Sequence, residues 1–285
     1  MPFSPTAVYP AVISATRPVF ESVDSLASCH DIDDLDEALT ILSAHCDESR
    51  SAATSLLRDR YRWRGYSEAH LPPIESESCF PLLITRGGRP VGTLTVGLDN
   101  HKGLTAESTF PEEIRAFRDA GVRLSEFTRL AVDSNSGSQQ VLVALFQVAY
   151  LAAARLGNAD RVVMEVNPRH VAYYVRMLGA NVAGPVRTHA GANAPAVLLC
   201  IAFEDVKERI ADCLRKLDSE PVTGRSPYSK ALTAAEEAAI LDRLSLHVGA
   251  RPGDRKPFLF RLEGPGRDRR AQPRNPGGAL QAAAS

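Results

Sequence analysis

The sequence lacks the features that mark several large classes of protein. Its five cysteines are widely spaced and odd in number, and none belongs to a Cys-x-x-Cys pair. This spacing argues against a disulfide scaffold and against a structural zinc site. The formal net charge is only -1 over 285 residues, which provides no overall attraction for nucleic acid. We therefore expect neither a bound metal nor a nucleic-acid partner.

The sequence also lacks a clear targeting or membrane segment. No basic residue precedes Arg17, and three prolines lie ahead of the Arg17-Pro18 pair, a composition unlike that of a secretory signal peptide. The uncharged stretch from Gln139 to Ala154 is interrupted by Gln147 and is shorter than the roughly 20 residues that cross a bilayer. These absences predict a cytoplasmic protein without a transmembrane segment.

What the sequence does contain is one continuous unit, residues 124–181, on which the rest of the chain is expected to pack. Leu124–Val132 is predicted to form a strand, and Gln139–Leu156 a helix that is apolar around most of its circumference and therefore buried. The valine-rich run at 162–166 is too short for a helix and is typical of a buried strand. A second helix follows, for which Asn167 is the predicted cap.

Strands and helices alternate along the rest of the chain. Hydrophobic patterning, capping residues and a Gly-Gly hairpin signal predict strands at 39–46, 81–85, 91–98 and 196–203, and helices at 48–61, 111–120, 204–217 and 233–247. Such an order predicts an α/β (α+β) fold, with a mixed central sheet and helices on both of its faces.

Four regions are predicted along the chain. Residues 1–38 would form an N-terminal extension, 39–204 the main domain, and 205–250 a C-terminal helical segment. Residues 251–285 contain eight basic and three acidic residues and are rich in proline and glycine. Such a composition buries too little apolar surface to offset the entropy of ordering, and predicts a disordered tail.

Several short motifs occur in a recognisable order. Glu126-Phe127-Thr128-Arg129-Leu130-Ala131-Val132 fills the first strand of the central unit, and Asn167, Tyr174 and Gly179 mark its second helix. Further motifs lie at 57–66, 92–99 and 103–113. Over about residues 39–203 the sequence resembles the N-acyl amino acid synthases (the FeeM-like family) of the GNAT acyltransferase superfamily, which are related to the acyl-homoserine-lactone autoinducer synthases.

The resemblance implies transfer of a fatty acyl group from acyl carrier protein to the amine of an amino acid, giving an N-acyl amino acid. Alternatives are a CoA-dependent N-acetyltransferase and a non-catalytic acyl- or protein-binding module with the same fold. A homoserine-lactone product also stays open. Neither the amino acid nor the length of the acyl chain follows from the sequence, and the acylated product is compatible with membrane association.

The loop before the long helix bears on the acyl donor. CoA-using members of the superfamily hold the CoA pyrophosphate there on backbone N–H groups beside small residues. Here the loop consists of Asn135, Ser136, Gly137 and Ser138, and larger side chains fill both small positions, Ser138 and Gln140. A carrier protein's phosphopantetheine has a single phosphate and needs less of this loop. The loop therefore favours an acyl-carrier-protein donor over acyl-CoA, with no other cofactor bound.

Glu126 and Tyr174 are the predicted catalytic residues. Amide formation requires a base for the acceptor's ammonium group, and Glu126 is the candidate, although a structural ion pair with an arginine would also explain it. Tyr174 matches the superfamily's tyrosine that protonates the leaving thiolate, although a tyrosine at this position could equally be part of the core. His170 is a weaker candidate for the base, because a histidine in a helix's first turn is usually a surface residue.

Arg129 and Thr128 are predicted to bind the acceptor. Arg129 could hold the acceptor's carboxylate through two hydrogen bonds, or it could brace Glu126. Thr128 shares a face of the regular strand with Glu126, whereas Arg129 does not. If both Glu126 and Arg129 face the cleft, a β-bulge must lie between them.

Each of the remaining candidates has a functional explanation and a purely structural one. Asn167 would hydrogen-bond the pantetheine arm or only cap its helix. The aromatic residues Trp63 and Tyr66 would line the acyl channel or pack in the core. A basic cluster near the first helix would dock the acidic carrier protein or form an ordinary solvated face; it contains Arg58, Arg62 and Arg64.

Overall fold

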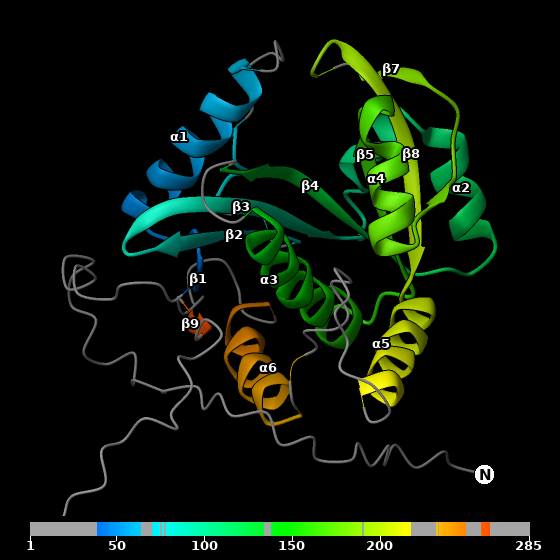
Figure 1. Cartoon of the computed structure of the whole chain (residues 1–285). Coiled ribbons are helices and arrows are strands. Elements are labelled where there is room, and N and C mark those ends of the chain that lie inside the picture. Colours follow the sequence, from blue (N-terminus) through cyan, green and yellow to red (C-terminus); the bar gives the residue numbers. More distant parts are fainter. Residues whose placement is uncertain are drawn as a thin grey trace, which may run out of the picture.

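A computed structural model describes residues 39–63, 70–74, 76, 78–133, 138–189, 191–217, 232, 234–248 and 258–262. Its centre is a nine-stranded sheet in the order β6-β8-β5-β4-β3-β2-β1-β9, with β7 paired to β8 (Figure 1). The strands are β1 Leu39–Ser43, β2 Cys79–Arg86, β3 Arg89–Leu98, β4 Leu124–Val132, β5 Arg161–Val166, β6 Asn181–Val182, β7 Arg187–His189, β8 Ala194–Ala202 and β9 Leu259–Leu262. Among the strands that the structure describes, β4 and β5 pair in parallel and the other ladders are antiparallel.

Helices cover both faces of this sheet, as the sequence predicts. They are α1 Asp47–Trp63, the 3-10 turn η2 Thr105–Ser108, α2 Pro111–Asp119, α3 Ser138–Tyr150, its π-helical continuation η3 Leu151–Leu156, α4 Pro168–Leu178, α5 Phe203–Leu217 and α6 Ala234–Val248. In Figure 1, α1 and α4 rise on opposite sides of β4, and α3 runs below the sheet with α6 beyond it.

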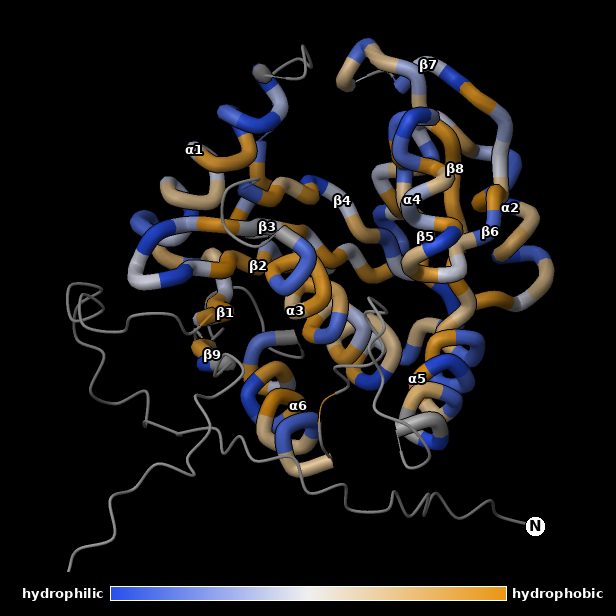
Figure 2. The backbone as a smooth tube through the Cα atoms, viewed as in Figure 1, coloured by the Kyte–Doolittle hydropathy of each residue, from blue (hydrophilic) through white to orange (hydrophobic). Residues whose placement is uncertain are grey.

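The largest core lies between the sheet and α3. Leu145 and Val148 of α3 pack there against strand residues such as Val96 and Phe127. Gly92 on β3 allows the close approach, because a Cβ atom at that position would come 2.4 Å from Val141 Cγ1. Figure 2 shows hydrophobic residues following the central strands and α3. Gln139–Leu156 has the length and composition of a membrane span, but 56% of it is buried inside the protein, as in many core helices.

The opposite face carries two smaller cores. One gathers around α2 and η2 and includes Leu124 and Val163. The other lies beneath α1 and includes Ala131. Since Leu124 and Ala131 both belong to β4, the middle of β4 runs between the two cores, and Glu126 lies in that interval.

The two central parallel strands separate soon after they meet. β4 and β5 pair only through Leu124–Arg161, Ser125–Val162 and Glu126–Val163. Both strands continue beyond this point, β4 to Val132 and β5 to Val166. The sheet therefore opens between them, as a cleft that admits a thioester arm requires.

Some local features differ from the sequence-based prediction. The polar loop expected before α2 contains the turn η2, and the loop expected after Asn181 contains the short strands β6 and β7. The disordered tail predicted for 251–285 is wrong for 258–262, where β9 pairs with β1 and Phe258 N–H donates to Ser43 Oγ at 3.2 Å. The N-terminal extension 1–38 lies outside the described residues.

Candidate functional site

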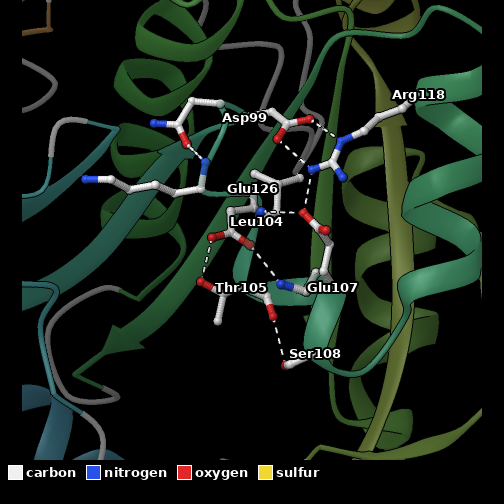
Figure 3. Close-up of polar contacts among 10 residues, drawn as sticks. Asp99, Leu104, Thr105, Glu107, Ser108, Arg118 and Glu126 are labelled. Carbon is white, nitrogen blue, oxygen red and sulfur yellow. Dashed lines mark hydrogen bonds and ion pairs between the residues drawn. The ribbon is translucent and has the colours of Figure 1, made fainter.

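Glu126 projects from β4 toward η2 and is almost completely buried, with 2% of its surface exposed. The Thr105 hydroxyl donates to Glu126 Oε1 at 2.7 Å, and the Ala106 amide donates to Oε2 at 3.1 Å (Figure 3). Gly97, its neighbour on β3, makes room for the side chain, because a Cβ there would lie 2.7 Å from Glu126 Cγ. Each carboxylate oxygen therefore has a partner, and both partners come from one turn.

A second polar network holds that turn from the other side (Figure 3). Glu107 accepts from the Leu104 amide at 2.7 Å and also pairs with Arg118 of α2. Arg118 binds Asp99 through two hydrogen bonds of 2.8 and 2.7 Å. Arg118 lowers the pKa of Glu107 and keeps it ionised. The turn that presents Thr105 to Glu126 is thus fixed to both β3's end and α2.

Burial raises the pKa of Glu126 above its ordinary range, although the hydrogen bonds from Thr105 and Ala106 oppose the shift. The negative charge of Glu165 on β5 raises it further. A carboxylate with a raised pKa holds a proton more strongly and is a better base near neutral pH.

β4 contains a β-bulge, which begins at Arg129 rather than between Glu126 and Arg129. Thr95 pairs with Thr128 and Thr93 pairs with Ala131, so two β4 residues, Arg129 and Leu130, lie opposite one on β3. Arg129 has φ of 53°, a left-handed conformation that is uncommon for arginine. Its Nε donates to His70 O at 2.5 Å and its Nη1 to Thr128 Oγ1 at 3.0 Å. Strained backbone of this kind is frequent at functional sites.

Two residues that sequence reasoning did not select, Glu165 and His189, meet nearby. His189 Nε2 on β7 lies 3.4 Å from Glu165 Oε2 on β5, and the Ala192 amide donates to His189 Nδ1 at 3.0 Å. Glu165 raises the pKa of His189, and the charge of Arg129 acts in the opposite direction. Arg129, Glu126, Glu165 and His189 thus share one electrostatic neighbourhood.

A signal for Glu165 existed in the sequence. It is the one charged residue between Val162 and Val166 in a strand recognised as buried, and a buried carboxylate is costly unless it is paired or used. His189 had no such signal, because β7 has only three residues and follows a loop rich in glycine and proline.

Tyr174 lies on the other side of the sheet from Glu126. It is partly buried and packs on the α3 core, and its ring meets that of Tyr173 edge to face at 5.4 Å. Phe127, adjacent to Glu126, belongs to the same α3 core, whereas Glu126 faces η2. A group in the gap between β4 and β5 would therefore have Glu126 and Tyr174 on opposite sides.

An apolar pocket opens on the α3 side. Its lining runs from the strands to α3, α5 and α6, and includes Phe127, Val143, Phe146, Val162, Phe203 and Ile210. The space of about 680 Å³ around this lining includes open solvent at the pocket's mouth. Because Phe127 and Val162 flank the point where β4 and β5 separate, the pocket lies next to the gap.

The structure describes some of the other predicted site residues and leaves others outside its described ranges. Asn167 caps α4 by accepting from the Arg169 amide at 3.2 Å, and His170 Nε2 accepts from Arg169 Nε. Arg58 and Arg62 are exposed on successive turns of α1. Outside the described residues lie Arg64, Tyr66, Asn135, Ser136 and Gly137, and also the side chains of Trp63 and Ser138. Among the described residues, no group of three His, Cys, Asp or Glu side chains could hold a metal ion.

The model of the family described as N-acyl amino acid synthase FeeM matches residues 52–202, more than half of the chain. The chain belongs to the N-acyl amino acid synthase FeeM family. The protein is accordingly an N-acyltransferase with the GNAT fold. The FeeM match extends from α1 to β8 and includes every residue of the electrostatic neighbourhood around Glu126. No curated protein matches the sequence.

Several solved structures are similar to this chain. FeeM from uncultured soil microbes is 22% identical, with a TM-score of 0.54, and the match covers 60% of this chain and 95% of that one. The AHL synthase LasI is 17% identical, with a TM-score of 0.43 and coverage of 59% and 91%. An acyl-CoA N-acyltransferase from Pseudomonas aeruginosa is also 17% identical, with a TM-score of 0.40 and coverage of 57% and 98%.

Replacing Glu126 with glutamine should change how stability depends on pH. Because burial raises the pKa of Glu126 in the folded state above 4.5, the folded wild type loses stability as the pH rises from about 4.5 through that higher value. E126Q does not titrate, and its amide can still accept from Ala106 and donate to Thr105. The stability of E126Q relative to wild type should therefore increase with pH and then level off.

Urea denaturation of both proteins between pH 4.5 and pH 8 measures this difference. The circular dichroism spectrum at pH 8 serves as the control for an intact fold. The free energy of unfolding of E126Q minus that of wild type should grow with pH. If this difference stays constant or shrinks as the pH rises, the assigned burial of the Glu126 charge is contradicted.

Proposed function

We propose that the protein transfers a fatty acyl group from the phosphopantetheine thioester of acyl carrier protein to the amine of an amino acid, producing an N-acyl amino acid. The observation that carries this proposal is the gap between β4 and β5, which has an acidic and basic cluster on one side and an apolar pocket on the other. Membership of the FeeM family supports the same reaction.

The acyl chain is assigned to the apolar pocket. A thioester carbonyl in the gap would lie beside Phe127, and the alkyl chain could continue between α3 and α5. Burying each methylene contributes about 0.8 kcal/mol, so a pocket of this kind favours long chains. The partly buried Glu237 lies at its lining, where burial raises its pKa and so favours the uncharged form.

The acceptor is assigned to the polar side of the gap. Arg129, turned by the bulge, would hold its carboxylate, next to Thr128. Glu126 would accept the proton of the ammonium group, directly or through the Thr105 hydroxyl, which already donates to it. The raised pKa of Glu126 suits this task.

The remaining proton transfer is assigned to Tyr174. The freed amine attacks the thioester carbonyl carbon, the C–N bond forms, and the C–S bond breaks. The departing thiolate needs a proton, and Tyr174 lies on the α4 side of the gap, opposite Glu126. Asn167 caps the helix that carries Tyr174 and so fixes the position of its first turn.

Two features of the chain support a carrier-protein donor over CoA. Ser138 and Gln140 fill the two positions where CoA-using members have small residues, so a donor with a single phosphate fits better. Arg58 and Arg62 form an exposed basic pair on α1, which suits an acidic carrier protein.

Purified protein incubated with acyl carrier protein charged with palmitate and with the twenty common amino acids should release N-acyl amino acids. Palmitoyl-CoA at the same concentration should react more slowly. E126Q should lower kcat by about 10²- to 10⁴-fold, the usual contribution of a positioned base. Mass spectrometry identifies both the product and the accepted amino acid. If neither palmitoyl carrier protein nor palmitoyl-CoA gives product, the proposed function is overturned.

Replacing Val143 with phenylalanine should shorten the preferred acyl chain. Val143 lines the pocket and is 7% exposed, so an added ring would occupy space assigned to the chain's distal methylenes. The ratio of kcat/KM for palmitoyl over octanoyl carrier protein should fall about tenfold or more. The matched control is L142F, since Leu142 is the preceding residue of α3 and does not line the pocket. Equal ratios in both variants would place the acyl chain elsewhere.

Reversing the charge of Arg58 and Arg62 together should weaken recognition of the carrier protein. R58E/R62E should raise the KM for acyl carrier protein about tenfold, and the effect should shrink at high salt, because the attraction is electrostatic. Reactivity with a free acyl-pantetheine thioester should be unchanged. R115E, on the exposed surface of α2, controls for a general change of charge, and an equal effect of both variants would remove α1 as the docking site.

A further inference from the structure

β5 carries a buried carboxylate that the transfer described above does not use. The Glu165 side chain is 7% exposed, and its Oε1 is buried without a hydrogen-bond partner among the residues that the structure describes. Leaving such an oxygen unsatisfied costs free energy, and native structures rarely do so without a reason. An uncompensated oxygen beside a proposed active site indicates a ligand atom that donates to it.

The position of Glu165 on β5 places it at the opening of the sheet. Val163 is the last β5 residue that pairs with β4, and it packs in the core around η2. Glu165 is two residues further along β5, so it projects from the same face as Val163. That face is also the one from which Glu126 projects toward η2. Glu165 therefore lies where β4 has already moved away from β5, on the side assigned to the acceptor.

His189 holds one oxygen of Glu165. The Ala192 amide donates to His189 Nδ1 at 3.0 Å, and Nε2 faces Glu165 Oε2 at 3.4 Å. The histidine therefore orients the carboxylate through Oε2, and Oε1 has no partner among the residues that the structure describes. Arg129 lies on β4 beyond its last pair with β5, and Glu165 lies on β5 beyond its last pair with β4. The guanidinium group and this carboxylate thus come from the two strands that border the gap.

We propose that Glu165, positioned by His189, binds the α-ammonium group of the acceptor while Arg129 binds its carboxylate, so that the acceptor is an α-amino acid bound as a zwitterion. This assignment rests on the proposed function. The ammonium group then passes one proton to Glu126, and the neutral amine attacks the thioester. An α-hydroxy acid would leave Glu165 without its cationic partner, and a simple amine would leave Arg129 without an anion.

Binding measured without turnover tests the subsite. Saturation-transfer NMR compares three pairs on the full chain: glycine with glycolate, L-leucine with its α-hydroxy analogue, and L-phenylalanine with L-3-phenyllactate. For at least one pair the amino acid should bind about tenfold or more tightly than the hydroxy acid. E165Q, which retains an acceptor for His189, should bring that ratio near one. E113Q is the matched control, because Glu113 is a partly buried carboxylate paired with Arg187 outside the site.

Steady-state kinetics separate this proposal from the proposed function. E165Q should raise the KM for the amino acid about tenfold and leave the KM for the acyl donor unchanged. H189A should add little in the E165Q background, because His189 acts through Glu165. Acyl transfer that keeps its acceptor KM in E165Q would overturn the subsite and leave the function standing. Selective amino-acid binding without any acyl transfer would overturn the function and leave the subsite standing.

Discussion

The parting of β4 and β5 is the constraint on which the rest of the structure depends. Parallel strands normally continue their ladder, because each unpaired backbone N–H and C=O group in a protein interior needs a partner. Here the ladder ends at Glu126 and Val163, although both strands go on. The bulge at Arg129 lies just beyond this point on β4. The opening therefore coincides with an irregular segment of the strand itself.

Glu126 shows how a fold can hold a buried carboxylate, a group that is costly to remove from water. Its desolvation is opposed by two donors from η2, and η2 is itself held by the Glu107–Arg118–Asp99 network. The arrangement leaves the carboxylate with a raised pKa and still hydrogen-bonded. A second carboxylate, Glu165, adds its repulsion. Two acidic groups on one face are stable only with such a framework, since like charges in low dielectric disfavour each other strongly.

Much of this fold could be predicted from the sequence because its elements are locally encoded. β4 has the bounds expected for it, and Asn167 caps α4 as its residue type indicates. The sequence predicts a bulge only if Glu126 and Arg129 both face the cleft, because alternation along a regular strand puts them on opposite faces. β9 was missed because it gains its stability from pairing with β1, which is distant in sequence. β7 pairs locally with β8, but its three residues are too few to show a strand pattern of their own.

The candidate site was harder to predict than the fold, for the same physical reason. Glu126 was recognisable because it lies in a motif, but its partners Thr105 and Ala106 come from a loop whose turn forms only against β4. Glu165 and His189 meet because β7 folds back on β8, next to β5. Each residue alone has an ordinary explanation, and only the tertiary contact between them creates an oriented, uncompensated carboxylate.

The sheet also separates two environments that the reaction requires at the same time. An alkyl chain gains free energy in the dry pocket beneath α3, whereas a zwitterion needs charged partners on the other face, and neither environment could serve both. Alternation along β4 makes this possible, because Phe127 lines the pocket and its neighbour Glu126 faces η2. In the proposed reaction the two substrates would approach one another through the gap between β4 and β5. A carbonyl carbon held there would meet the amine on one side while its chain stayed on the other, so the pleat of a single strand would set the orientation.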